Sequence, residues 1–167
     1  MIPQVLTNMN MFVDGRSFHN KVKELVLPVL KRKLETNRMG GMDAEIDMPI
    51  GLEKLECNFT IKGFSPELLR FFGLASDLPF SGNFRGAFKD EDGTVHAVIV
   101  TARGLLSEVD MGTWTPGDGA QKKFSLALRA YKLEYDGRVL IDIDVTAPRR
   151  VINGVDELAA ERAAIGL

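Results

Sequence analysis

Residues 52–62 alternate between apolar and polar side chains over most of their length. The apolar positions are Leu55, Cys57, Phe59 and Ile61, and the polar positions are Lys54, Glu56, Asn58, Thr60 and Lys62. A period of two residues is typical of a strand with one buried face and one solvated face. The same pattern recurs at residues 30–37, 44–48 and 122–133. We therefore predict a mainly β (α+β) fold that presents a sheet surface.

Two turn motifs pair further predicted strands into hairpins. Acidic residues precede a glycine at Asp90-Glu91-Asp92-Gly93 and again at Asp136-Gly137, which favours tight hairpin turns. The strands that these turns join are predicted at residues 80–89, 94–106, 121–135 and 138–144.

Residues 30–62 are predicted to form hairpin strands around a glycine-hinged loop at 38–43. Gly40 and Gly41 allow the backbone to turn, and Met39 and Met42 are adaptable apolar anchors. The loop either folds onto its own core or becomes ordered against a neighbouring subunit. Residues 49–51 predict a turn before the next strand.

The two ends of the chain have different predicted structures. Residues 1–10 are polar and irregular, and we interpret them as an N-terminal arm ahead of a short strand at 11–13. Residues 153–167 predict a C-terminal helix, with Asp156 in a variant of the capping box. One imperfect apolar stripe of this helix consists of Val155, Leu158, Arg162 and Ile165.

A short flanking helix is predicted after residue 64. Ser65 is expected to cap it, Pro66 to occupy its first position and Glu67 to complement its dipole. Gly73 is expected to end it.

The strand predicted to begin at residue 94 is too long for a compact domain. An uninterrupted strand over 94–109 would span about 50 Å, whereas a chain of this size has a radius of gyration of about 15 Å. Either Gly104 breaks the strand with a bulge or its end projects beyond the core. A projecting strand has unpaired backbone groups, which favours assembly with other chains.

Composition restricts the function classes. The chain has 167 residues, 45% hydrophobic and 26% charged, which fits a single domain over residues 1–167. The net charge of −2 excludes a global basic surface for nucleic acid. The single cysteine, Cys57, is predicted to be a small core residue. We find neither a membrane span nor a signal peptide in the sequence, and expect no membrane insertion.

The sequence offers no catalytic cluster. His19 and His96 lack neighbours at metal-ligand spacing, and both are interpreted as structural histidines. The acidic turn at 90–93 lacks the spacing of a calcium loop, and Asp142 with Asp144 is a weak metal signal. We therefore predict a protein that is not an enzyme and needs no cofactor.

Several short motifs in a fixed order carry a resemblance that covers the whole chain. They are Met1-Ile2-Pro3-Gln4-Val5-Leu6-Thr7-Asn8, Phe12-Val13-Asp14-Gly15, Arg38-Met39-Gly40-Gly41-Met42-Asp43-Ala44, Phe84-Arg85-Gly86, Trp114, Tyr131-Lys132-Leu133-Glu134, Asp136-Gly137-Arg138, Val151-Ile152-Asn153-Gly154-Val155-Asp156-Glu157-Leu158-Ala159 and Leu167. Together they resemble the major tail tube proteins of contractile-tailed bacteriophages and R-type pyocins, the phage tail tube FII-like family.

The resemblance implies a structural role in a virion tail tube or tailocin particle, assembled in the host bacterial cytoplasm. Each subunit would be an antiparallel β-sandwich or barrel with a flanking helix. Hexameric rings would stack into a tube, with long strands joining a multi-subunit β-barrel around a channel for DNA or ions. The implied partners are further copies of the chain, the tail sheath protein, baseplate and tail-terminator proteins, and a tape-measure protein in the lumen. DNA would pass through without specific binding.

On this resemblance, two sets of residues become candidate sites. The expected inter-subunit contacts are Arg38, Met39, Gly40, Gly41, Met42, Asp43, Ile2 and Pro3. The candidate lumen-facing residues are Lys31, Lys33, Glu35, Lys54, Glu56, Asn58, Thr60 and Lys62. A conduit should not hold DNA, and these polar faces mix both signs of charge. Residues 30–38 are more basic than the family implies.

Three other classes of protein stay open at this point. A hexameric ring of a type VI-like secretion tube would share the architecture. A soluble β-sandwich binding module would need an apolar cavity and would not form rings. A small hydrolase would need a nucleophile and a base, which the sequence does not supply.

Overall fold

The computed structural model describes residues 2–72 and 79–167 of the chain. The helix end predicted at Gly73 lies outside these described residues. The described strands are β1 Val5–Val13, β2 Arg16–Ser17, β3 Val22–Val26, β4 Arg32–Asn37, β5 Ile46–Leu52, β6 Glu56–Lys62, β7 Phe80–Lys89, β8 Val95–Asp110, β9 Gln121–Tyr135, β10 Arg138–Asp144, β11 Arg149–Ile152 and β12 Val155–Asp156. The helical segments are α1 Pro66–Leu69, the 3-10 turn η1 Arg70–Phe72 and α2 Ala159–Ala164. The mainly β, antiparallel prediction is confirmed.

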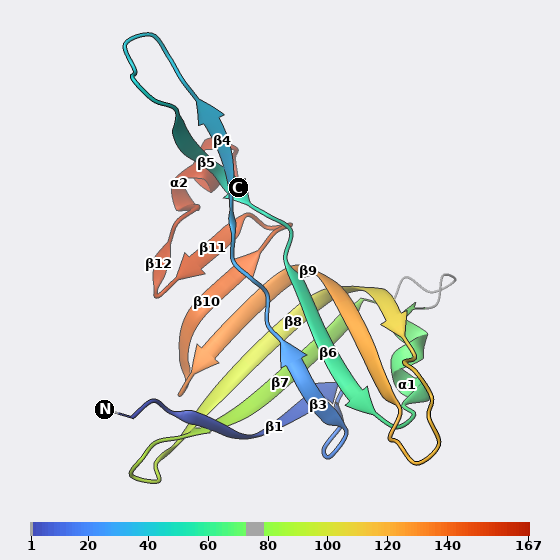
Figure 1. The fold of residues 1–167 in the computed structure, drawn as a ribbon. Helices are drawn as coiled ribbons and strands as arrows, with labels where there is room; N and C mark the ends of the chain where they lie inside the picture. The colour runs from blue at the N-terminus through green and yellow to red at the C-terminus, as the bar shows by residue number, and fades with distance from the viewer. Residues whose placement is uncertain (1, 73–78) are drawn as a thin grey trace.

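Two long strands, β8 and β9, run through both layers of the body. They pair with each other over most of their length, and β9 pairs on its other edge first with β6 and then with β10. One layer therefore runs β3-β6-β9-β8, and the other runs β1-β7-β8-β9-β10-β11-β12. Figure 1 shows β3 and β6 crossing in front of β7 and β8.

A bulge at Gly104 bends β8 from one layer into the other. The pairing register shifts between Arg103 and Gly104, where β9 contributes one extra residue, Arg129. A Cβ atom at Gly104 would lie 2.2 Å from the backbone oxygen of Ala127, so only glycine fits here. The bulge, rather than a projecting end, explains the length of this strand.

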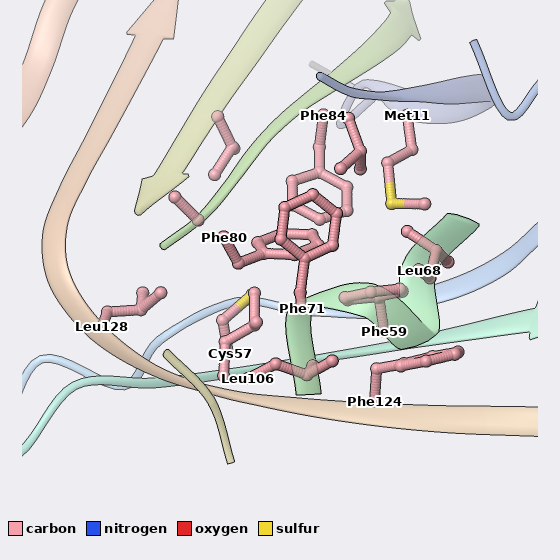
Figure 2. Close-up of a cluster of buried hydrophobic side chains, with 14 of the residues drawn as sticks. Met11, Cys57, Phe59, Leu68, Phe71, Phe80, Phe84, Leu106, Phe124 and Leu128 are labelled. Atoms are coloured by element: carbon pink, nitrogen blue, oxygen red, sulfur yellow. The ribbon is translucent and has the colours of Figure 1, made fainter. Parts of the chain in front are cut away.

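The core lies between the two layers and is built around Phe59 (Figure 2). The Phe59 ring stacks on Phe124 at a centroid distance of 5.0 Å and contacts Phe80 and Phe84 of β7 at 5.7 and 5.8 Å. The apolar positions of 52–62 are all buried, as predicted. Cys57 is one of them, and burial raises the pKa of its thiol to about 12, so it is an inert core residue.

Both ends of the chain differ from their predictions. Residues 5–10 are not irregular, because β1 begins at Val5 and pairs along β7. The C-terminal helix begins at Ala159 instead of Asn153. Asn153 and Gly154 have φ values of 50° and 85°, and they form the tight turn of the β11–β12 hairpin.

Two local predictions are also wrong. Residues 49–51 form no turn, because β5 continues through them with a register shift that leaves Ile50 unpaired. Ser65 precedes α1 with Pro66 at its first turn, but its hydroxyl makes no cap hydrogen bond, and the Leu68 N–H donates to the Ser65 backbone oxygen instead. Among the described residues, no helix is long and apolar enough to cross a membrane.

Candidate functional site

The β4–β5 hairpin projects from the body as a separate two-stranded sheet (Figure 1). Its strands pair only with each other, and its base is closed by a 2.8 Å hydrogen bond from the Glu53 N–H to the Lys31 oxygen. A two-stranded hairpin is marginally stable in water unless something packs on it. What could pack on this hairpin therefore depends on the side chains that its two faces expose.

Apolar side chains are exposed along the whole hairpin. Those at least 47% exposed are Leu34 at 51%, Met39 at 69%, Ile46 at 50%, Met48 at 47% and Ile50 at 55%. Isolated exposed apolar residues are ordinary, but a cluster on one projecting element marks an interaction site.

The pairing register places apolar groups on both faces of the hairpin. Glu35 stands opposite Met48 and Asn37 opposite Ile46, so the polar positions of β4 share a face with the apolar positions of β5. Leu34 lies on the other face, beside the Thr36 hydroxyl, which donates to Asp47 at 2.8 Å. Neither face is purely solvated or purely apolar, so both are suited to contact with another chain.

The end of the hairpin holds most of the predicted inter-subunit residues. The Met42 N–H donates to the Met39 oxygen at 3.1 Å, and Arg38 Nε donates to the Met42 oxygen at 3.4 Å. Asp43 and Glu45 are exposed, and in the described parts of the chain neither carboxylate has an ion pair or hydrogen bond. The loop is thus ordered by its own backbone and presents free carboxylates.

The other predicted contact residues, Ile2 and Pro3, lie at a different corner of the molecule (Figure 1). Both are exposed, Ile2 by 61%. The next residue, Gln4, donates from Nε2 to the Tyr135 hydroxyl at 2.7 Å. The structure therefore does not bring the two predicted contact sets together.

A second surface is the outer side of the β3-β6-β9-β8 layer, which we call the polar sheet face. Cross-strand register aligns Asn58, Ser125 and Glu108 in one row. The polar residues of this face are Glu24, Glu56, Asn58, Lys62, Glu108, Asp110, Lys123 and Ser125, and the exposed apolar residues Val26 and Leu105 also lie on it. Four of these are acidic and two are basic, a net charge of −2.

The candidate lumen residues are distributed over two elements. Glu56, Asn58 and Lys62 lie on the polar sheet face. Thr60 points the same way but is buried, with the longer Glu24 and Lys123 opposite it, so it adds no surface. Lys54 is exposed beside Glu56, with a 3.2 Å ion pair between them.

The remaining three candidates belong to the hairpin and the segment leading into it. Lys33 and Glu35 are exposed on β4, and Lys31 forms a 3.7 Å ion pair with Glu53 at the base. They therefore do not form one continuous surface with β6.

A third surface, which the sequence did not reveal, combines a buried lysine with exposed aromatic rings. Lys122 is 1% exposed, and its Nζ lies 4.0 Å from the ring centroid of Phe64. Phe64 is 60% exposed and meets Trp114, 66% exposed, edge to face at 5.8 Å. We call these three residues the aromatic–lysine site. The sequence contains one indication that Lys122 is buried. Lys122, Phe124 and Leu126 occupy alternate positions of one strand, so their side chains lie on the same side of it.

His96 is held between two carboxylates, in agreement with its predicted structural role. Its Nδ1 lies 2.5 Å from Asp136 and its Nε2 lies 2.6 Å from Asp90. Hydrogen bonds to Asp136 and then to Asp90 raise the pKa of His96, and the bond to His96 lowers the pKa of Asp136. The cluster joins the β7–β8 turn to the β9–β10 turn. In the described part of the chain, no three His, Cys, Asp or Glu residues are grouped so that they could hold a metal ion.

Comparisons with known proteins agree on one family. Residues 3–166 match the family described as Phage tail tube protein FII. The chain is 33% identical to the tail tube protein of Escherichia phage P2 over 173 aligned positions, which cover 99% of each chain. It is 29% identical to the major tail tube protein of Serratia phage KSP20, over 86% of this chain and 84% of that protein.

Solved structures share the fold at low sequence identity. A chain of the PVC sheath-tube complex, an extracellular contractile injection system in the extended state, matches with a TM-score of 0.60 at 11% identity, over 79% of this chain and 91% of that chain. A chain of the anti-feeding prophage baseplate matches with a TM-score of 0.52 at 13% identity, over 80% of this chain and 97% of that chain.

Proposed function

Because the chain belongs to the phage tail tube protein FII family, we propose that it is a structural subunit of the inner tail tube of a contractile phage tail or tailocin. Subunits form hexameric rings, and the rings stack around a channel through which DNA or ions pass. The subunit performs no catalysis and needs no cofactor in this role.

One observation carries the proposal, namely that the β4–β5 hairpin leaves the body with apolar groups exposed on both faces. A monomeric binding protein gains nothing from such an element, whereas a tube subunit covers it with neighbouring copies. Residues 38–43 and the N-terminal residues Ile2 and Pro3 are the contacts that we assign to neighbouring subunits.

The polar sheet face is the surface that we assign to the lumen. Acidic residues outnumber basic ones on this face, giving it a net charge of −2. Such a surface does not replace the counterions of DNA, and their release is what drives phosphate binding. Strands β3, β6, β9 and β8 would then join those of neighbouring subunits into one continuous barrel, which pairs their edges. A reconstruction of the assembled ring with Glu56, Asn58 and Lys62 away from the bore would contradict this assignment.

The partners follow from the same role. Further copies of the chain form the tube, the tail sheath protein surrounds it, and baseplate and tail-terminator proteins bind its ends. A tape-measure protein occupies the lumen before DNA does. The subunit resides in the virion tail or tailocin particle after assembly in the host cytoplasm.

Negative-stain electron microscopy of concentrated protein, combined with a light-scattering mass, tests the role. We expect hollow six-fold rings or stacked tubes, either spontaneously or after addition of preformed tube ends. Protein that stays monomeric even with tube ends would overturn the proposal. Copurification with a phage-type sheath protein distinguishes this role from that of a type VI-like secretion ring.

A further inference from the structure

We propose that the aromatic–lysine site receives the hairpin end of a second copy of this chain, and that Asp43 or Glu45 of that copy supplies a carboxylate to Lys122. This inference rests on the proposed function, since it names the docking partner of the hairpin inside the tube. It assigns a role to a lysine that the free subunit leaves unsatisfied.

Lys122 is an anomaly within its own subunit. It stands opposite Ile61 on the inward side of β9, and its ammonium group is buried with no hydrogen-bond acceptor among the described residues. A buried ammonium without an anion is strongly unfavourable, so buried charges in proteins are normally paired. The Phe64 ring at 4.0 Å supplies a cation–π contact, which offsets only part of that cost.

Lys122 is covered by the exposed ring of Phe64, which in turn contacts Trp114. Phe64 lies in the short segment between β6 and α1, and Trp114 lies in the loop between β8 and β9. Both rings are mostly exposed, and Trp114 is held by one 3.3 Å hydrogen bond from its Nε1 to the Met111 oxygen. A partner that packs on these rings would bury them and could displace Phe64 from the ammonium group.

The hairpin end has the complementary chemistry. Met39 is 69% exposed, and methionine makes favourable contacts with aromatic rings. Asp43 and Glu45 are exposed carboxylates without a partner in the described parts of the chain, whereas Asp47 already accepts from Thr36. Lys122, a cation beneath Phe64 without an anionic partner among the described residues, is thus complementary to Asp43 and Glu45, which are unpaired anions close in sequence to Met39 and Met42.

The two surfaces lie at opposite ends of the subunit. Figure 1 shows the hairpin extending away from the body on the side remote from α1, next to which Phe64 lies in sequence. In this structure the hairpin end therefore does not reach the aromatic–lysine site of its own subunit. Contact between unlike ends of successive copies is a heterologous arrangement, which propagates into a stack.

One carboxylate of the same subunit is a competing partner. Glu67, close in sequence to Phe64, forms a 3.7 Å ion pair with Arg16 through Oε1, whereas its Oε2 is buried without a hydrogen bond among the described residues. A rearrangement within the subunit could pair Glu67 with Lys122 and would need no second copy. The experiment must therefore separate a pair within the subunit from a pair between subunits.

The first test replaces Lys122 by an uncharged side chain of similar length. For Lys122→Met we expect an unchanged or higher melting temperature of the unassembled subunit, because a buried unpaired charge is removed. We expect the critical concentration for tube growth from preformed ends to rise by about tenfold or more, which is the effect of losing one good contact. Lys21→Met is the matched control, since Lys21 is an exposed lysine 5.8 Å from the Phe18 ring.

The second test exchanges the charges. Lys122→Glu should block tube growth, and the combination with Asp43→Lys and Glu45→Lys should restore it, whereas the combination with Glu67→Lys should not. Restoration by Glu67→Lys would overturn the proposal in favour of a pair within the subunit. Growth of Lys122→Met at the wild-type concentration would also overturn it.

Failure of this inference is distinguishable from failure of the proposed function. If the unmodified protein forms no rings or tubes, the proposed function is wrong and the docking pair with it. If the unmodified protein and Lys122→Met both form tubes equally well, the function holds and only the docking pair is wrong.

Discussion

Strand β6 and the β4–β5 hairpin share one sequence pattern but have opposite surroundings. In β6, the apolar side chains at every second position are buried, and Phe59 is only 1% exposed. In the hairpin, Leu34, Ile46 and Met48 are all about half exposed. A period of two identifies a two-faced strand, but it does not say whether the layer that covers the apolar face belongs to the same chain.

The two regions also differ in how the register combines their faces. β6 is flanked by β3 and β9, and its own apolar side chains all point inward, although Lys122 of β9 also lies inside and Val26 of β3 lies outside. In the hairpin, the register shift at Ile50 places Glu35 opposite Met48, so that polar and apolar side chains share one face. A core strand contributes to one interior, whereas on the proposed function the hairpin contributes to a surface that another copy of the chain completes.

Removing one core ring should have the largest effect on the unassembled subunit. Phe59→Ala leaves a cavity between Phe80, Phe84 and Phe124 and should cost about 3–5 kcal/mol in the free energy of unfolding. Ile46→Ala in the hairpin should change it by no more than about 0.5 kcal/mol. Urea denaturation of both variants tests the contrast. An equal loss for both would mean that the hairpin packs on the core in solution.

A glycine of the body, Gly104 in β8, should likewise tolerate substitution less well than a glycine of the hairpin. Gly104→Ala forces a Cβ against the Ala127 backbone oxygen and should cost about 1–3 kcal/mol, a fall of several degrees in the melting temperature. Gly40→Ala meets open space at a position without a positive φ, and should change stability by no more than about 0.5 kcal/mol. Calorimetry of both variants would sharpen the contrast, and a tolerated Gly104→Ala would refute the tight bulge.

Polar substitutions on the hairpin should act on assembly and leave folding intact. Leu34→Ser with Met48→Ser removes one apolar group from each face, and each side chain is worth about 1 kcal/mol when its exposed half becomes buried. We expect the critical concentration for tube growth to rise by about tenfold or more, with an unchanged unfolding midpoint. Sedimentation of tubes grown from preformed ends measures it, with Lys21→Met as a control. Wild-type growth would show that the hairpin faces solvent in the tube.

The smallest effect is expected from the pH dependence of the body. The raised pKa of His96 means that its stabilisation is fully present below the usual value of about 6.5 and is lost as pH rises through the folded-state pKa. The lowered pKa of Asp136 means that its stabilisation is lost as pH falls below about 4. The loss of melting temperature in His96→Gln should therefore be larger near pH 5.5 than near pH 9. Equal losses at both pH values would contradict the ion-pair account.

Features set by neighbouring residues were predictable from the sequence. The turns at 90–93 and 136–137 and the core positions of β6 depend on local patterns and turn chemistry, and the structure contains them. The position of residues 38–43 at the end of a hairpin was predictable for the same reason. Their contact with a neighbouring subunit stays a prediction. At Gly104 the structure has the bulge but no break, because β8 continues from Val95 to Asp110.

Features set by distant residues were not predictable in this way. The strand at 5–10 is ordered by pairing with β7, about eighty residues away, which no local pattern reports. The alternating pattern places Lys122 in a strand but does not predict its burial, because that burial depends on the packing of Phe64 above it. At Asn153-Gly154 the hairpin signal was present, but the apolar spacing of the following residues favoured a helix.

The shared β8–β9 ladder makes the body stiff under mechanical load. A pull along these two strands loads their hydrogen bonds in shear, so that many must break together, and the ladder spans both layers. The β4–β5 hairpin can instead be unzipped from its free end, one pair at a time. Where such subunits contact one another through these hairpins, we expect the hairpin contacts to yield before any subunit body deforms.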